Sequence, residues 1–283
     1  MPRLLSEAQI ARYREEGYLA PIRIMEEPAA LALRAGLEAV EARMGGKLRG
    51  DLRHKSHLLF PFLADLVRHK LLLDVIEDVL GPDLLCWNSN FFIKEAANPA
   101  FVSWHQDSTY WGLSAPEVAT AWVALTPSTA ANGAMTVLPG SHKSDQIPHR
   151  DTFDRHNLLT RGQEVAVAVD ETKAVPLILK PGEMSLHHVR LVHGSPPNPS
   201  PDRRIGFAIR YIPAHIRQLE GEDSASLVRG TDRFRHFELE PRPDSEMAPE
   251  MLALHKRNAE RSARILYRGT GVASFNDPQA VRG

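Results

Sequence analysis

Hydrophobic positions change their spacing along the chain near residue 84. Before that point they recur at helical spacing, after the capping pair Ser6 and Gln9, over 28–43 and over 64–80. After it, short runs rich in aromatic and β-branched residues alternate with Pro, Gly, Asn and Ser. The pattern predicts helices in the first part of the chain and strands in the middle.

The middle of the chain predicts a series of short strands separated by turns. These strands cover 84–94, 102–107, 120–126, 135–138, 165–169, 175–179, 184–188, 191–193 and 205–212. Many short strands of this kind are typical of a sandwich or barrel, and residues 247–266 return to a helical pattern. We therefore expect a mainly β fold, a double-stranded β-helix (a cupin-like jelly roll) flanked by α-helices at the N-terminus and the C-terminus.

The length of the chain, 283 residues, is compatible with one domain, because barrels and sandwiches often use about 200–250 residues as a single unit. We expect one domain over 1–283, with a mainly helical part at 1–82, a jelly-roll core at 83–215 and a C-terminal extension with a helix at 216–283. Within the core, the polar segment 141–163 is long for a connection, and such segments are usually functional lids or disordered. We expect a mobile lid, with a passive surface loop as the alternative.

Charge and composition narrow the classes of partner. The chain has 34 Lys and Arg against 35 Asp and Glu, so no overall basic field draws it to nucleic acid or to a membrane. No apolar run approaches the roughly 20 residues that span a bilayer. Cys86 is the only cysteine, and the first residues lack the apolar run of a secretory signal. We expect a cytoplasmic protein that acts on a small molecule; the pattern does not indicate an oligomeric state.

The segment Trp104-His105-Gln106-Asp107 carries the first candidate chemistry. Side chains alternate faces along a strand, so a strand over 102–107 projects His105 and Asp107 to one side and Gln106 to the other. A second imidazole from another strand would complete a two-histidine, one-carboxylate set, which binds Fe(II) on one face and leaves the opposite positions open. His-x-Asp alone is a weak signal, because two polar residues on a surface strand produce the same pattern.

Residues 191–211 read as a strand, a Pro-rich turn and a second strand. We expect His193 and Arg204 to lie on neighbouring strands of one sheet and to face the same interior. The small residues Gly206 and Ala208 share the face of Arg204 and leave room for a ligand beneath its guanidinium. Arginine suits this position because its planar fork binds a carboxylate through two hydrogen bonds.

Taken together, these motifs resemble the phytanoyl-CoA dioxygenase family of Fe(II)- and 2-oxoglutarate-dependent oxygenases, which includes ectoine hydroxylases. The resemblance is carried by Trp104-His-Gln-Asp107, Ala121-Trp122, Asn132-Gly133-Ala-Met135, Leu138-Pro-Gly-Ser-His142, Lys180-Pro-Gly182, and His193-Gly-Ser195 with Asn198 and Arg204. It implies that His105, Asp107 and His193 are the catalytic iron ligands. It also implies that Arg204 holds the far carboxylate of 2-oxoglutarate.

The resemblance extends to neighbouring residues and to the reaction. It implies that Ser195 and Trp122 support the co-substrate and that Gln106 lies beside the metal. In the reaction of this family, Fe(II), 2-oxoglutarate and O₂ hydroxylate an unactivated C–H bond, with release of succinate and CO₂. Related halogenases have a small residue at the position of Asp107, which leaves room for chloride, so the carboxylate here indicates hydroxylation.

The substrate is the least determined part. Asn90, Phe92, Tyr110 and Trp111 are candidates for a mixed polar and aromatic substrate pocket, although Tyr110 and Trp111 are also suited to the core. The segment 141–163 contains Lys143, Arg150 and Arg155, which favours a small polar or anionic metabolite over an apolar one.

Two of the site assignments have competing residues nearby. His187 and His188 compete with His193 as the distal ligand, but only His193 is followed by Gly-Ser and stands eleven residues before Arg204. Arg203 replaces Arg204 if a bulge shifts the strand by one residue.

Trp122 and Arg210 also have purely structural interpretations. Trp122 could be ordinary core, and Arg210 is expected to form a surface ion pair. At the level of the whole protein, a non-catalytic jelly-roll binding module and a zinc hydrolase with the same three ligands compete with the oxygenase. A zinc hydrolase has no need of an arginine such as Arg204 for a dicarboxylic co-substrate.

Overall fold

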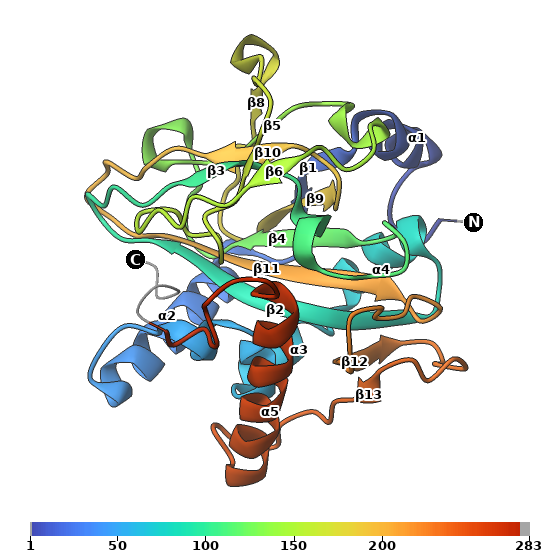
Figure 1. The fold of residues 1–283 in the computed structure, drawn as a ribbon, viewed down its shortest axis with the longest axis vertical. Helices are drawn as coiled ribbons and strands as arrows, with labels where there is room; N and C mark the ends of the chain where they lie inside the picture. The colour runs from blue at the N-terminus through green and yellow to red at the C-terminus, as the bar shows by residue number, and fades with distance from the viewer. Residues whose placement is uncertain (1, 278–283) are drawn as a thin grey trace.

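The computed structural model describes residues 2–277, which fold into three β-sheets, two of which face each other, with several helices on one side (Figure 1). The helices are α1 (Glu7–Glu16), α2 (Glu27–Met44), α3 (Pro61–Leu66), α4 (Lys70–Leu80) and α5 (Pro249–Leu266). The strands are β1 (Tyr18–Arg23), β2 (Leu84–Lys94), β3 (Val102–His105), β4 (Ala119–Ala124), β5 (Thr136–Val137), β6 (His149–Arg150), β7 (Glu164–Val165), β8 (Val175–Pro176), β9 (Glu183–His188), β10 (His193–Ser195), β11 (Arg204–Pro213), β12 (Ser224–Arg229) and β13 (Glu238–Leu239).

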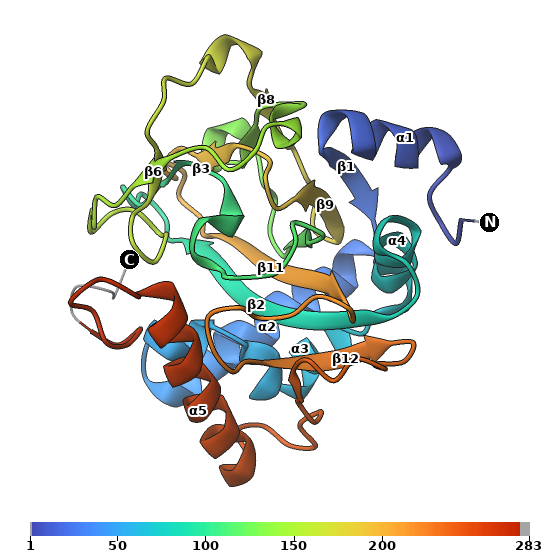
Figure 2. The ribbon, with the colours of Figure 1, turned by 45° about the vertical axis from the view of Figure 1, so that its right-hand side comes forward.

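The two sheets have different sizes. The large sheet has the order β1-β9-β4-β11-β2-β12-β13, and the small sheet has the order β3-β10-β5-β8. Helices α2, α3 and α5 lie on the outer side of the large sheet, and the small sheet lies on its inner side (Figures 1 and 2). Strands that are neighbours in each sheet are mostly distant in the sequence, as in a jelly roll. The predicted mainly β, jelly-roll fold with flanking helices is therefore confirmed.

Strand β11 shows how the alternating sequence separates core from site. Its apolar face, which includes Phe207, Ile209 and Tyr211, belongs to one hydrophobic cluster with residues of the helices, such as Leu63 and Ile76. The other face looks toward the small sheet. Because successive side chains point to opposite faces of a strand, the same ten residues supply both the core and the floor of the cavity between the sheets.

The helical N-terminal part differs in detail from the prediction. The capping box at Ser6 and Gln9 is present, and α1 ends at a left-handed Gly17. The predicted helix over 64–80 is two helices, α3 and α4, and the sequence analysis missed β1. That strand contains Pro21 and lies at the edge of the large sheet, where a residue without a backbone N–H is tolerated.

The C-terminal extension also contains more than its predicted helix. Strands β12 and β13 extend the large sheet beyond β2, and α5 follows them. The segment after α5 returns to the jelly roll, where the Phe275 ring stacks on His54 with 3.9 Å between ring centroids. The predicted extension runs to residue 283, and its end, 278–283, lies outside the described residues. Among residues 2–277, no helix has the length and apolar character needed to cross a membrane.

Candidate active site

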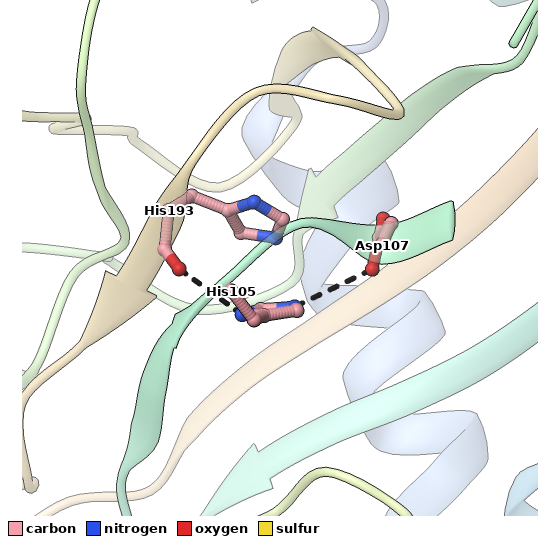
Figure 3. A group of neighbouring side chains, drawn as sticks. All are labelled: His105, Asp107 and His193. Carbon is pink, nitrogen blue, oxygen red and sulfur yellow. Dashed lines mark hydrogen bonds and ion pairs between the residues drawn. The ribbon is translucent and has the colours of Figure 1, made fainter. Parts of the chain in front are cut away.

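Two histidines and one aspartate converge at one point between the sheets. His105 ends β3 and His193 begins β10, and the two residues are direct partners in the antiparallel pair. Their ligand atoms and those of Asp107 all lie within 4.8 Å of one another (Figure 3). The predicted strand over 102–107 stops at His105, and Asp107 instead begins a 3-10 helix, η3 (Asp107–Tyr110). The carboxylate still reaches the centre, although not by strand alternation.

Hydrogen bonds orient both imidazoles. The Nδ1 atom of His105 lies 2.9 Å from the carbonyl oxygen of Ser103 and 3.0 Å from that of His193. The Nδ1 atom of His193 lies 2.8 Å from the carbonyl oxygen of Leu191. A carbonyl only accepts, so each Nδ1 carries the proton and each Nε2 keeps its lone pair. This is the usual arrangement of metal-binding histidines, so the donor set fits a divalent metal.

The charge states of Asp107 and His193 also suit the binding of a metal ion. Burial opposes ionisation of Asp107, but the neighbouring imidazoles of His105 and His187 and the charge of Arg210 hold its pKa well below the ordinary value. Burial and the neighbouring His105 hold the pKa of His193 well below its ordinary value. A metal needs an ionised carboxylate and a neutral imidazole, which is the combination that these two shifts favour for Asp107 and His193.

The two competing histidines lie in different places. His187 is buried beside the centre, with Nε2 3.8 Å from Asp107 Oδ2 and its ring centroid 4.8 Å from that of His193. His188 points to the opposite side, where its Nδ1 accepts a hydrogen bond from the backbone N–H of Arg190. His187 is therefore a neighbour of the three residues, whereas His188 is not.

Arg204 reaches the same cavity from the opposite sheet. The cavity is lined by the three convergent residues and by Trp122, Met135, Ser195 and Arg204. The expectation that His193 and Arg204 lie on neighbouring strands of one sheet is wrong, because β10 belongs to the small sheet and β11 to the large one. The two side chains meet because the sheets face each other across the cavity.

The guanidinium of Arg204 is almost completely enclosed, with 2% of the residue exposed. One of its N–H groups donates to the carbonyl oxygen of Gly133 at 2.7 Å, and its Nε has no hydrogen-bond partner among the described residues. Burial lowers the pKa of Arg204 to about 10, so the side chain is charged at neutral pH. A buried cation with a free donor is suited to a carboxylate ligand.

Lys94 is a second cation at this end that the sequence analysis missed. It is the direct partner of Arg204 in the β2–β11 ladder, and its Nζ donates to Ser195 Oγ at 2.6 Å. Burial and the charge of Arg204 lower the pKa of Lys94 to about 6. Within residues 2–277, the hydrogen bonds of Lys94 and Arg204 go to carbonyl and hydroxyl oxygens rather than to carboxylates. Strand pairing, which the sequence does not show, was needed to find this lysine.

Trp122 occupies the space that the sequence analysis left for a ligand. A Cβ atom at Gly206 would lie 1.8 Å from the indole ring, so the glycine makes room for Trp122. The Arg204 guanidinium carbon lies 5.1 Å from the ring centroid. Trp122 is thus a wall of the cavity, and the expected open space beneath Arg204 is filled by it.

The remaining predicted residues separate into two groups. Asn90, Phe92 and Trp111 line a second cavity beside the first. Tyr110 instead packs against Arg161 and donates a hydrogen bond to Asp151.

Gln106 does not face the cavity either. Its side chain donates to the carbonyl oxygen of Arg190 at 2.8 Å and accepts from the backbone N–H of Ile147 at 2.7 Å. It therefore fastens the segment 141–163 rather than contacting the centre.

The segment 141–163 lines part of the second cavity, but its charged side chains are not among the lining residues. Leu158, Leu159, Thr160 and Gln163 line this cavity. Lys143 and Arg150 pair with Glu15 and Glu164 at the surface. The cations of this segment therefore give little support to an anionic substrate, contrary to the reasoning from sequence.

Arg210 is the cation that does line this space. It is 6% exposed and contributes to both cavities, and it donates to Asn90 Oδ1. Its guanidinium carbon lies 5.3 Å from the Trp111 ring centroid. The expectation of a surface ion pair is wrong, because the inner face of β11 is covered by the small sheet and the loops around it.

Comparisons with known proteins agree with this geometry. The family model of phytanoyl-CoA dioxygenase matches residues 1–206. A probable alpha-ketoglutarate-dependent hypophosphite dioxygenase of Stutzerimonas stutzeri is 34% identical over 167 residues, 58% of this chain and 58% of that protein. An L-proline trans-4-hydroxylase of Streptomyces griseoviridis is 26% identical over 233 residues, 72% of this chain and 87% of that protein.

A solved structure extends the likeness to most of the chain. The non-heme monooxygenase ThoJ, in its apo form, superimposes with a TM-score of 0.80 and 36% identity, covering 91% of this chain and 96% of that one. The predicted family is confirmed, and with it the oxygenase class and the requirement for iron and 2-oxoglutarate. The chain belongs to the phytanoyl-CoA dioxygenase family.

Proposed function

We propose that the protein is an Fe(II)- and 2-oxoglutarate-dependent hydroxylase of a small polar metabolite, with His105, Asp107 and His193 as the iron ligands. The observation that carries the proposal is the convergence of these ligand atoms within 4.8 Å, with both Nδ1 atoms fixed by carbonyl groups. A two-histidine, one-carboxylate set of this kind would hold Fe(II) from one side and leave room for 2-oxoglutarate and O₂.

The chain positions the reactants rather than performing the oxidation itself. Iron held by these residues would, with 2-oxoglutarate and O₂, supply the chemistry that converts a C–H bond to C–OH, one oxygen atom going to the substrate and the other to succinate, with release of CO₂. Arg204 and Lys94 hold the far carboxylate of 2-oxoglutarate, and Ser195 lies beside them. Trp122 closes the cavity on one side and excludes water from it.

The polar character of the proposed substrate rests on two kinds of support. The two relatives above are named for hypophosphite and L-proline, which are small and polar. In addition, Arg210 brings a buried positive charge to the cavity wall next to Asp107. An anionic group on the substrate is therefore favoured.

The pairing of Arg204 with Lys94 weighs against a zinc hydrolase and against a binding module. A zinc hydrolase would use the same three ligands, but it has no use for a buried guanidinium and a buried lysine that both lack a carboxylate partner among the described residues. A non-catalytic binding module would not need two histidines in the metal-binding tautomer beside an aspartate. Lys94 and Arg204 together suit a dicarboxylic co-substrate.

Two measurements test the proposal. Calorimetry of the protein loaded with Mn(II), which binds like Fe(II) but does not turn over, should show one 2-oxoglutarate bound per chain, with weak binding when metal is removed. With Fe(II) and O₂, succinate release should increase when the correct member of a metabolite panel is added. Binding of 2-oxoglutarate that does not depend on metal would contradict the assigned site.

A further inference from the structure

A second cavity adjoins the proposed iron site. Phe92, Asp107 and Arg210 contribute to both spaces and form their common wall. The rest of the second cavity comes from distant parts of the chain: β2, the 3-10 helix η1 (Gly50–Arg53), the segment 141–163 and the segment after α5. A molecule held in this cavity would therefore lie directly beside Asp107.

Two buried polar atoms of this cavity lack hydrogen-bond partners among the described residues. They are Nε of Arg210 and Oδ1 of Asn88, on residues that are 6% and 8% exposed. The two residues are direct partners in the β2–β11 ladder, so their side chains leave the sheet side by side on the same face. Buried polar groups are nearly always paired, which points to a ligand that accepts from the arginine and donates to the asparagine.

The charges around the cavity favour an anion. Arg53 and Arg210 both line it, and Asp107, a proposed iron ligand, is its only acidic lining residue within 2–277. Burial and the charge of Arg210 lower the pKa of His54 to about 3, so this imidazole adds no charge near neutral pH.

The apolar part of the lining is aromatic. Phe92, Trp111, Tyr267 and Phe275 line the same space. Flat rings suit the carbon skeleton of a small molecule, with its polar end at the sheet.

We propose that this cavity binds the primary substrate as a small organic oxyanion, with the anionic group on the Arg210 guanidinium and a neighbouring N–H or O–H group donating to Asn88 Oδ1. This inference rests on the proposed function, since it names the substrate class of the same site. Because Arg210 borders the iron cavity, the C–H bond that reacts lies only a few bonds from the anionic group. Cationic metabolites are excluded by the same charges.

A different role for Arg210 would be to position Asp107 without touching substrate, because its charge also stabilises that carboxylate. The two roles predict different losses. A substrate anchor affects the affinity for the anion and leaves metal and 2-oxoglutarate binding unchanged. A positioning residue affects metal and 2-oxoglutarate binding first.

The first experiment uses the full chain loaded with Mn(II) and 2-oxoglutarate. The probes are small carboxylates, including L-proline, and small alkyl phosphonates, each paired with its uncharged amide. At least one oxyanion should raise the melting temperature and bind in calorimetry at least tenfold more tightly than its amide. The two arms show whether the anion is a carboxylate or a phosphorus acid. Absence of any such oxyanion, or equal binding of acid and amide, would overturn the inference.

Variants then locate the bound anion. Arg210→Gln should weaken its binding at least tenfold, Arg210→Lys less, and Asn88→Leu severalfold, with 2-oxoglutarate affinity unchanged in all three. Arg23→Gln on β1, where the exposed guanidinium pairs with Glu183, is the matched control and should bind the anion normally.

Each remaining outcome has a definite meaning. Unchanged anion binding in Arg210→Gln, or a parallel loss of 2-oxoglutarate binding, would refute the anchor role. If Arg210→Gln does not fold, Arg210→Lys and Asn88→Leu decide the question. Failure of the unaltered protein to bind 2-oxoglutarate would instead refute the proposed function.

Discussion

Arg204 and Arg210 lie on the same face of β11, six residues apart, and the structure around each of them is different. Arg204 is enclosed by Trp122 and by the carbonyl group of Gly133, with Lys94 as its strand partner. Arg210 lies against Asn90 and the Trp111 ring, in a space completed by loops. The same residue type on one strand therefore meets a site closed by the sheets at one end and a site completed by loops at the other.

The difference is also visible in where the lining residues lie along the chain. Except for Ala208 and Arg210, those around Arg204 come from within residues 1–206, the part that matches the family model. Arg210 and the tail residues Leu266, Tyr267 and Phe275 lie beyond it. This suggests a division in which the sheets bind the shared co-substrate and the added segments select the substrate.

The largest loss of activity is expected from a change at the iron site, because both the co-substrate and the substrate react there. His193→Ala removes one of three proposed ligands, so metal affinity should fall by more than the roughly 10–100-fold typical of losing a ligand's hydrogen-bond partner. Succinate formation should fall to background. Metal content and turnover measure this, and His188→Ala, at a histidine that points away from the centre, is the control. Normal turnover of His193→Ala would refute the ligand assignment.

Arg204→Met should weaken the binding of 2-oxoglutarate and leave the binding of the anion at Arg210 intact. Each charge-assisted hydrogen bond is worth about 1.5–3 kcal/mol, so the loss of one such bond should raise the KM for 2-oxoglutarate by about tenfold to about 150-fold. Arg204→Lys should be impaired too, because an ammonium cannot reproduce the planar fork. Anion binding at Arg210 should change little.

Arg203→Ala is the matched control for Arg204. Its guanidinium pairs with Glu41 and Glu95 on the opposite side of the strand. This variant should lower the unfolding temperature, because Glu41 is left without its partner, but it should keep the KM for 2-oxoglutarate. The reverse result, with Arg203→Ala alone raising KM, would mean that the strand register is different.

Lys94 should make the binding of 2-oxoglutarate at the Arg204 site dependent on pH. Its pKa is lowered to about 6, so above that pH the free site holds a neutral amine, and binding of a dicarboxylate should take up a proton. Affinity for 2-oxoglutarate should then fall as pH rises above 6, by up to about tenfold per unit. Calorimetry in buffers of different ionisation enthalpy measures the uptake, and Lys94→Met should abolish it. Binding without proton uptake in the unaltered protein would exclude this role.

We propose that the segment 141–163 is a mobile lid at the Arg210 end. The smallest of the expected effects is the change in its rate of proteolytic cleavage when ligands bind. The segment is held by Gln106 and by a hydrogen bond from Tyr110 to Asp151. Proteolytic cleavage within it should slow severalfold when metal, 2-oxoglutarate and the substrate anion are all bound. Equal cleavage with and without these ligands would indicate a passive loop.

The sequence by itself determined several of the helices, the alternation of the central strands and the three residues that converge between the sheets. Helical spacing and the capping box located α1, α2 and α5, and alternation in 204–213 separated the core face of β11 from its polar face. His105, Asp107 and His193 were identified from local motifs, and the structure brings them together. These features are accessible because they depend on neighbours within a few residues.

Only the tertiary structure decided which distant segments meet. It placed β10 and β11 in opposite sheets, paired Lys94 with Arg204 and added β1 at an edge. It also turned Gln106 toward the loop and buried Arg210 beside Asn88. Strand order and burial arise from closing the chain over itself, so the same arginine can be a surface charge or a buried anchor. The surrounding sheet, rather than the local sequence, makes that choice.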